Sequence, residues 1–271
     1  MASVTADLTS PPTMVRAGVN ANEIIYPHMS TTGLGDYSRN SGYTDGSVNL
    51  EWKTATFNYD RGTRISVDVM DNEESRNLAF GMAGAVLMRE KVAPEADAFT
   101  FAQIAGTENI SIGNPTTFAS AEEFLAELLA AKTLMDEDEV PEEERILYAT
   151  PTLMNSVLAL DSYKSREVLN SFAIKKKVPQ SRFYSAIDML DGRSEDEKIG
   201  HYRKGTGGLD INFMIVHKPA LIKYDKHTAS NIIPASLNVN ADADILKYRK
   251  YGIVDVYKNK AAGIFLSTKA E

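Results

Sequence analysis

The alternation of apolar and polar residues is most regular between residues 48 and 69. This stretch, VNLEWKTATFNYDRGTRISVDV, carries β-branched and aromatic residues with a period of two, interspersed with charges. A short apolar strand is expected at residues 23–29, and residues 30–47 between the two strands are mostly turn formers and polar residues. The pattern predicts a long two-stranded arm that cannot be buried on both faces. Because an isolated hairpin is marginal in water, the arm indicates support from a neighbouring subunit.

A long helix is predicted directly after the arm. Asp71 precedes Glu74 by three residues, as in a helix cap. An apolar stripe then runs to about residue 105, with Leu78, Met82, Ala85, Val86, Val92, Ala96 and Phe99 at spacings of mostly three and four. Pro94 should kink or split this helix. Taken alone, the stripe is typical of an ordinary core helix, but its pairing with the arm favours an assembly element.

The rest of the chain predicts a mixed sheet flanked by helices, followed by further strands. Ser120 and Glu123 form a capping box for a helix with Phe124, Leu125, Leu128 and Leu129 on its buried face. A helix is also expected after Thr150 and at 164–172, and strands at 145–149, 183–189 and 211–217. Residues 220–269 are typical of a half-exposed antiparallel sheet under the long helix, with a last turn at 259–261.

These segments together resemble the major capsid proteins of tailed bacteriophages, of siphovirus type, which have the Hong Kong 97-like fold. The resemblance rests on TTGLGDYSRNSGY in the arm, EW and NYDRG in the return strand, DNEE at the helix start, and later VPEEERILYATP, REVLNSF, VPQSRFY and AIDMLDG. It implies an α+β fold with an N-terminal arm (1–22), an E-loop hairpin and adjoining strands (23–70), the spine helix of a peripheral domain (71–110), an axial domain with a mixed sheet (111–218) and return strands of the peripheral domain (219–271).

The function implied by the resemblance is structural. Pentamers and hexamers of one chain would close an icosahedral shell around double-stranded phage DNA, in a virion assembled in the bacterial cytoplasm. The implied partners are further copies of the chain and a portal protein, with separate scaffolding and decoration proteins as additional candidates; the DNA would be enclosed without sequence-specific binding, and no membrane is involved. Candidate contacts between subunits are Asp36, Tyr37, Arg39, Tyr43, Glu51, Trp52, Lys53, Asp60 and Arg61.

Composition limits the other function classes. The formal net charge of −8 argues against a surface built to grip nucleic acid, and we interpret the basic clusters at 175–177 and 247–250 as solvated faces. The chain has no cysteine, so disulfides and thiolate metal sites are excluded. Residues 1–20 lack the features of a secretory signal, and no apolar run is long enough to span a membrane.

Candidate chemistry is sparse. The one histidine pair worth testing is His217 and His227, which would face each other across the strands on either side of Pro219, but the spacing matches no metal site. The acidic run at 136–144 lacks the calcium-loop pattern. We therefore expect no enzyme activity, no cofactor and no metal.

Two departures from the family concern assembly. Some relatives join subunits through an E-loop lysine, whereas residues 30–47 contain Arg39 and no lysine, so a noncovalent shell is expected. The chain begins close to the arm, which predicts a separate scaffolding protein or none. An encapsulin-type compartment for protein cargo is the nearest alternative, and a soluble α/β enzyme is a more distant one that leaves the charged arm unexplained.

Overall fold

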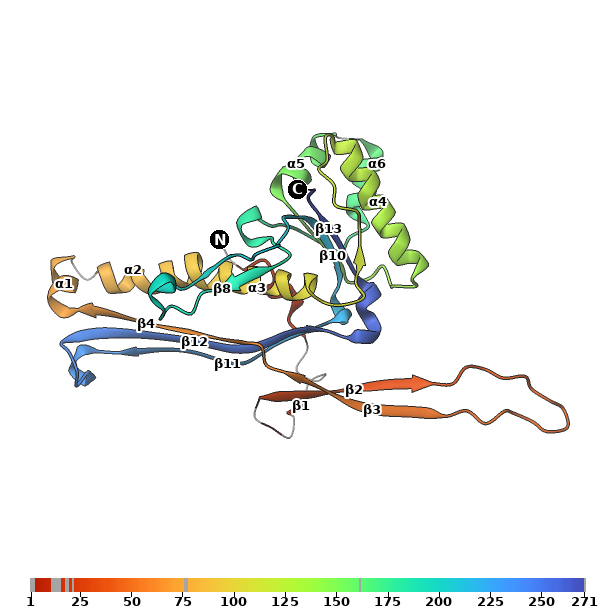
Figure 1. Ribbon diagram of the computed structural model, residues 1–271, viewed down its shortest axis with the longest axis horizontal. Helices are drawn as coiled ribbons and strands as arrows, with labels where there is room; N and C mark the ends of the chain where they lie inside the picture. Colours follow the sequence, from red (N-terminus) through yellow and green to blue (C-terminus); the bar gives the residue numbers. More distant parts are fainter. Residues whose placement is uncertain are drawn as a thin grey trace.

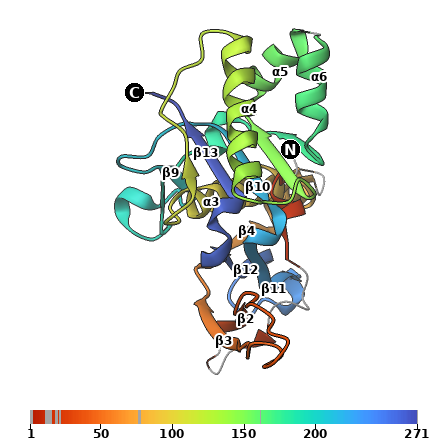
Figure 2. The ribbon, with the colours of Figure 1, turned by 90° about the vertical axis from the view of Figure 1, so that its right-hand side faces the viewer.

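The computed structural model describes residues 3–10, 16–17, 20, 22–75, 78–160 and 162–270. Its outline is elongated, with three parts visible in Figure 1. A long helical segment lies along a narrow sheet, a second body rises from one end of that layer, and a hairpin projects beyond the same end. Figure 2 shows the helices of the second body on the side away from the hairpin.

The narrow sheet is antiparallel and has the strand order β11-β12-β4. Its strands are β4 (Tyr59–Asp68), β11 (Leu221–Ile233) and β12 (Ala243–Val256). The sheet packs against the long helix, as predicted, through contacts such as the rings of Tyr59 and Phe99, whose centroids are 4.9 Å apart. The predicted return strand of residues 48–69 is divided into β3 (Val48–Thr56) in the arm and β4 in the narrow sheet. The division falls at residues 57–58, where the chain leaves the arm and enters the narrow sheet.

The long helix is segmented. It comprises α1 (Val69–Glu74), α2 (Leu78–Val86), a π-helical turn η3 (Leu87–Val92) and α3 (Ala93–Ala105). Asp68 caps its start by accepting a hydrogen bond from the Met70 backbone at 2.9 Å, so the prediction of a start at Asp71 was wrong. The cap falls earlier because β4 ends at Asp68 and the helix follows at once. The predicted kink or split at Pro94 takes the form of a change of helix type: the π-turn ends just before Pro94, which occupies the first turn of α3, and the backbone stays right-handed helical through Val92 and Ala93.

The second body is built on a five-stranded sheet of order β5-β13-β10-β6-β7. The strands are β5 (Ser111–Ile112), β6 (Arg145–Ala149), β7 (Ile174–Lys177), β10 (Ile211–His217) and β13 (Ile264–Thr268). The sequence prediction placed the last strand in the peripheral sheet, and that was wrong. All five residues of β13 are buried, which is typical of a central strand covered on both faces rather than of a half-exposed one.

Helices α4 (Ala121–Glu137), α5 (Pro151–Ala159) and α6 (Tyr163–Asn170) cover one face of this sheet, where Phe124 packs with Phe213. The capping box is confirmed, since Ser120 Oγ accepts from the Glu123 backbone at 3.2 Å. Leu129, predicted to be buried, is 38% exposed. The other face packs against α3, where Phe101 contacts Tyr148.

The arm pairs β2 (Glu23–Thr31) with β3 (Val48–Thr56) in an unbroken antiparallel register, and β1 (Arg16–Ala17) pairs with the base of β2. The remaining short elements are η1 (Ala6–Leu8), η4 (Gln180–Arg182), β8 (Ile187–Met189), η5 (Glu195–Glu197), β9 (Tyr202–Lys204), η6 (Lys218–Ala220), η7 (Ala235–Leu237) and η8 (Lys258–Gly263). In place of the tight turn predicted at 259–261, η8 connects β12 of the narrow sheet to β13 of the five-stranded sheet.

Candidate assembly surfaces and the interdomain cavity

The arm is anchored only at its base. Ile24, Tyr26 and Ala55 are buried there against Ile222 and Ile253 of the narrow β11-β12-β4 sheet, here named the peripheral sheet. The five-stranded sheet is named the axial sheet. Farther out the apolar side chains are exposed to solvent: Met29 is 64% exposed and Leu50 52%. The hairpin therefore projects with apolar side chains that no other part of the described chain buries.

The tip of the arm has a defined turn. Ser38 and Gly42 exchange backbone hydrogen bonds of 3.0 and 2.7 Å, and Gly42 has a φ of 78°, which favours glycine. The rings of Tyr37 and Tyr43 meet edge to face with centroids 4.9 Å apart, although both side chains are largely exposed. Four candidate contact residues, Asp36, Tyr37, Arg39 and Tyr43, thus lie together at the end of the arm.

The other five candidates are divided between the arm and the peripheral sheet. Glu51 accepts a hydrogen bond from Asn49, and Trp52 and Lys53 follow it on β3. Asp60 and Arg61 lie on β4 instead and have partners within the chain: Arg249 bonds Asp60 at 2.7 Å, and Arg61 bonds Glu95 at 2.7 Å. Their charges are used inside the subunit, so neither belongs to the exposed arm surface.

A second apolar surface follows the first half of the long helix. Met70 is 65% exposed, Leu78 60% and Met82 59%, whereas Phe99 in α3 is 7% exposed. The predicted stripe is therefore a core face only in α3. A helix of one chain rarely exposes such a row of large apolar side chains unless another molecule covers them.

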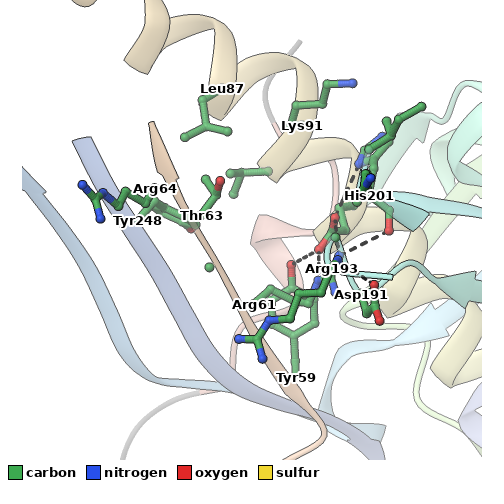
Figure 3. Close-up of a pocket in the computed structure, with 17 residues that line it drawn as sticks. Tyr59, Arg61, Thr63, Arg64, Leu87, Lys91, Asp191, Arg193, His201 and Tyr248 are labelled. Atoms are coloured by element: carbon green, nitrogen blue, oxygen red, sulfur yellow. Dashed lines mark hydrogen bonds and ion pairs between the residues drawn. The ribbon is translucent and has the colours of Figure 1, made fainter. Parts of the chain in front are cut away.

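A cavity of about 380 Å³ lies between β4, the π-turn η3 and the loop of residues 191–201. Figure 3 shows the residues that line it. At its floor Glu95 accepts hydrogen bonds from Arg61 and from the hydroxyl of Tyr59, and Glu95 Oε2 lies 3.4 Å from His201 Nδ1. Arg61 also donates to the carbonyl of His201. This cluster joins β4, the long helix and the loop of residues 191–201.

Burial and ion pairing set the protonation states of Glu95 and Tyr59 at the floor of the cavity. Burial alone would raise the pKa of the Glu95 carboxyl, but the contacts with His201 and Arg61 outweigh it and hold that pKa below its ordinary value. Burial, followed by the neighbouring Glu95 charge, raises the pKa of Tyr59 far above its usual range. Glu95 is therefore ionised and Tyr59 neutral at physiological pH.

A second polar cluster, which surrounds Asp97, has no local signature in the sequence. This fully buried carboxylate bonds Arg182 at 3.0 Å and accepts from the backbone and hydroxyl of Thr5 at 3.2 and 2.8 Å. Lys223 donates to the carbonyl and hydroxyl of Thr5 at 2.8 and 2.7 Å, and Leu8 is fully buried in the core. Residues 3–10, predicted as part of an N-terminal arm, instead pack into their own subunit. There Thr5 forms buried hydrogen bonds with Asp97 and Lys223.

The histidine and acidic candidates do not converge. His217 ends β10 in the axial sheet, and the exposed His227 lies on β11 in the peripheral sheet, so the predicted facing pair was wrong. In the acidic run, Asp136 pairs with the buried Arg145. No group of three or more His, Asp or Glu side chains suited to a metal ion occurs in the described ranges.

The basic clusters are also partly used within the chain. Lys176 pairs with Asp7 at 2.7 Å, and Lys250 pairs with Asp225 at 3.0 Å.

Among the residues that the structure describes, no helix combines the length and apolarity needed to cross a bilayer.

The described chain combines a projecting hairpin, a long helix on a narrow sheet and a second sheet body. Solved structures share this fold. A structure titled Mycobacterium phage Che8 superposes with a TM-score of 0.62 at 13% identity, covering 98% of this chain and 90% of the other. The mature capsid of bacteriophage PhiM1 gives 0.60 at 16% identity, with coverages of 93% and 83%.

A virus-like particle from Pyrococcus furiosus gives a TM-score of 0.53 at 10% identity and covers 88% of this chain and 85% of the other. No protein-family profile matches the sequence, and no curated protein matches it. The chain therefore has the fold of phage capsid proteins, the α+β Hong Kong 97-like fold that its sequence resembles.

Proposed function

We propose that the protein is the major capsid protein of a tailed phage, assembling as pentamers and hexamers into an icosahedral shell around double-stranded DNA. The observation that carries the proposal is the arm, whose outer apolar side chains have no cover within the described chain. The capsid fold supports it, because each subunit in a closed shell has neighbours on several sides that can bury such surfaces.

In this proposal β2 and β3 form the E-loop, and α1 to α3 form the spine helix. Seven of the candidate residues act as contacts between subunits: Asp36, Tyr37, Arg39, Tyr43, Glu51, Trp52 and Lys53. The arm of one subunit lies over a neighbour, and the uncovered helix face of Leu78 and Met82 is buried in the same way. Burial of each large apolar side chain contributes about 1.5–3 kcal/mol, so many such contacts stabilise a shell without a covalent link.

Electron microscopy and light scattering of the purified protein test the proposal, alone and with the product of a neighbouring scaffold gene. Closed shells, or free pentamers and hexamers, are expected. A small oligomer that persists under both conditions would overturn the proposal and favour the enzyme alternative.

Deletion of Gly33 to Gly46 gives a sharper test of the arm. No residue of this tip belongs to the buried clusters of the subunit. The shortened subunits should therefore stay folded, with an unchanged circular dichroism spectrum, but should assemble poorly. A Gly/Ser replacement of the same length separates the loss of side chains from the loss of reach. Normal shells from both variants would contradict the assignment of the E-loop.

An encapsulin-type compartment is the second candidate, favoured by the likeness to the Pyrococcus furiosus virus-like particle. The two functions differ in what the shell holds. Nucleic acid in shells purified from the native source would support the phage capsid, whereas a co-purifying protein cargo would support the compartment.

A further inference from the structure

Residues 3–10 lie against charged side chains from four different elements. Three of these side chains bond the segment directly: Asp97 of α3, Lys223 of β11 and Lys176 of β7. The fourth, Arg182 of η4, donates to Asp97 at 3.0 Å. We name these four residues the segment site. Because β11 lies in the peripheral sheet and β7 in the axial sheet, the segment contacts both sheets.

The Asp97 carboxylate binds the start of the segment. It is fully buried and accepts hydrogen bonds from the Ser3 hydroxyl at 2.6 Å and from the backbone N–H groups of Val4 and Thr5 at 3.1 and 3.2 Å. A fourth bond, of 2.8 Å, comes from the Thr5 hydroxyl. A buried carboxylate needs such donors, because charge left unpaired in the interior is strongly unfavourable. Without the segment, Arg182 would be its remaining partner among the described residues.

The Thr5 hydroxyl joins two opposite buried charges. It donates to Asp97 Oδ1 at 2.8 Å and accepts from Lys223 Nζ at 2.7 Å. Lys223, which is 5% exposed, also donates to the Thr5 carbonyl at 2.8 Å. A hydroxyl carries one donor and two acceptor lone pairs, so it satisfies both charges at once. Valine has nearly the same shape and can do neither, which makes this position selective for a hydroxyl.

The end of the segment is held by backbone and apolar contacts. The Ser10 N–H donates to the Lys223 carbonyl at 2.9 Å, and the Ser10 hydroxyl donates to the Leu221 carbonyl at 3.0 Å. The Lys223 N–H donates back to the Ser10 hydroxyl at 3.0 Å. Leu8 is fully buried in a core cluster that includes Leu221 of β11 and Val178, which follows β7. Polar bonds at both ends and an apolar anchor between them fix the segment in one register.

We propose that the segment site is a peptide-binding site that recognises a hydroxyl-bearing segment, and that residues 3–10 are its built-in ligand. The ligand class is a peptide with hydroxyl groups at the positions of Ser3 and Thr5 and a leucine three residues after the second. The site belongs to a single subunit, so it goes beyond the proposed function and does not depend on shell formation. A ligand tethered to its site experiences an effective concentration of about 1 mM. Because the segment is seated, the same peptide supplied free should bind with a Kd of about 1 mM or below.

Isothermal titration of a shortened subunit with a free peptide tests the site. The subunit begins at residue 11 after an initiating Met, and the peptide is acetylated SVTADLTS, residues 3–10. Binding of one peptide per subunit is expected. A Thr5→Val peptide should bind at least about tenfold more weakly, equivalent to about 1.4 kcal/mol, because it leaves Asp97 and Lys223 without their shared hydroxyl.

The matched control is a Thr9→Val peptide. It makes the same chemical change at an exposed residue whose hydroxyl bonds the Ala6 carbonyl of the segment itself, so binding should change less than about twofold. Against Lys223→Met subunits, the Thr5→Val change should cost less than it does when Lys223 is present, because the two groups share a hydrogen bond. The proposal is overturned if the unmodified peptide does not bind at millimolar concentration, or if the two valine peptides bind equally weakly.

Hydrogen exchange in the full-length chain gives a second test, which does not require the shortened subunit to fold. In the Thr5→Val variant, the amides of Val4 and Ser10 should exchange at least about tenfold faster than in the wild type. In the Thr9→Val variant they should not change, and the amides of the buried strand β10 serve as the reference in both. Equal exchange rates in the two variants would also overturn the proposal. Assembly, followed separately by electron microscopy, tells a failure of this site from a failure of the proposed function.

Discussion

Replacing Lys223 with Met would test how tightly residues 3–10 are seated in the core. Lys223 is 5% exposed, and its ammonium donates to the carbonyl and hydroxyl of Thr5. Burial, with the nearby charge of Lys250, lowers the pKa of Lys223 from 10.5 to about 8. Met has a similar length and no charge, so the variant removes the titration while keeping most of the packing.

The size of the effect follows from the two pKa values. Between pH 8 and 10.5 the unfolded chain still holds the lysine proton and the folded chain has lost it, so the stability of the wild type rises with pH. Integration over this difference gives a gain of about 2.5 kcal/mol for the wild type relative to Lys223→Met between pH 7 and pH 10. The other titrating groups are common to both proteins and cancel in the comparison.

The assay is urea unfolding of unassembled subunits, followed by circular dichroism at pH 7, 8, 9 and 10. Lys258→Met is the matched control, because Lys258 is exposed and its stability difference from the wild type should not vary with pH. Parallel profiles for wild type and Lys223→Met, with a change below about 0.5 kcal/mol, would refute the reasoning. They would mean that water reaches the ammonium and that Thr5 does not seal the site.

Three further substitutions test the packing. Leu8→Ala should lower the unfolding free energy by about 2–5 kcal/mol in urea, because this side chain is fully buried, and a loss below about 1 kcal/mol would show that the segment is not seated. Glu95→Gln should cost about 1–3 kcal/mol at pH 7 through its bonds to Arg61. Because the pKa of Glu95 lies below its ordinary 4.5, this difference should shrink as pH falls through the folded value, and a difference constant to pH 2 would contradict it. Gly62→Ala should cost about 1–3 kcal/mol, since a Cβ there would lie 2.8 Å from the Tyr248 carbonyl, and unchanged thermal unfolding would refute this.

Local patterns predicted the elements that depend on local chemistry. Strand β10 occupies the predicted range of 211–217, and the capping box of Ser120 and Glu123 starts α4. The arm was predictable because period-two alternation with charges on it admits few other structures. These features are set by residues close in sequence, so the sequence carries the information directly.

Tertiary context decided the rest. The run Ile264–Thr268 resembles a half-exposed strand, but its place between β5 and β10 buries both faces. Residues 3–10 look like a polar arm, and only the fold brings Asp97 and Lys223 to Thr5 from about ninety and two hundred residues away. Long-range polar pairing of this kind has no periodic signature.

The candidate contact residues and the cavity show the same difference between local and long-range information. The sequence located the tip of the arm, where Tyr37 and Tyr43 meet, because tip residues are contiguous. It grouped Asp60 and Arg61 with them, although β4 takes both into the peripheral sheet. The cavity draws its lining from positions 59 to 248, which no local pattern in the sequence brings together.

The distribution of charged and apolar contacts separates two tasks within the chain. Ionic partners join elements within one subunit: Arg61 of β4 pairs with Glu95 of α3, and Arg182 of η4 pairs with Asp97 of α3. The large apolar side chains without cover lie instead on the arm and on the first half of the long helix, at Met29, Leu50 and Leu78. Apolar burial is non-directional and tolerates small changes of angle, whereas paired buried charges require fixed geometry. Under the proposed function, a subunit held rigid by internal ion pairs and joined to its neighbours by apolar surfaces would suit a shell in which one chain meets several slightly different neighbours.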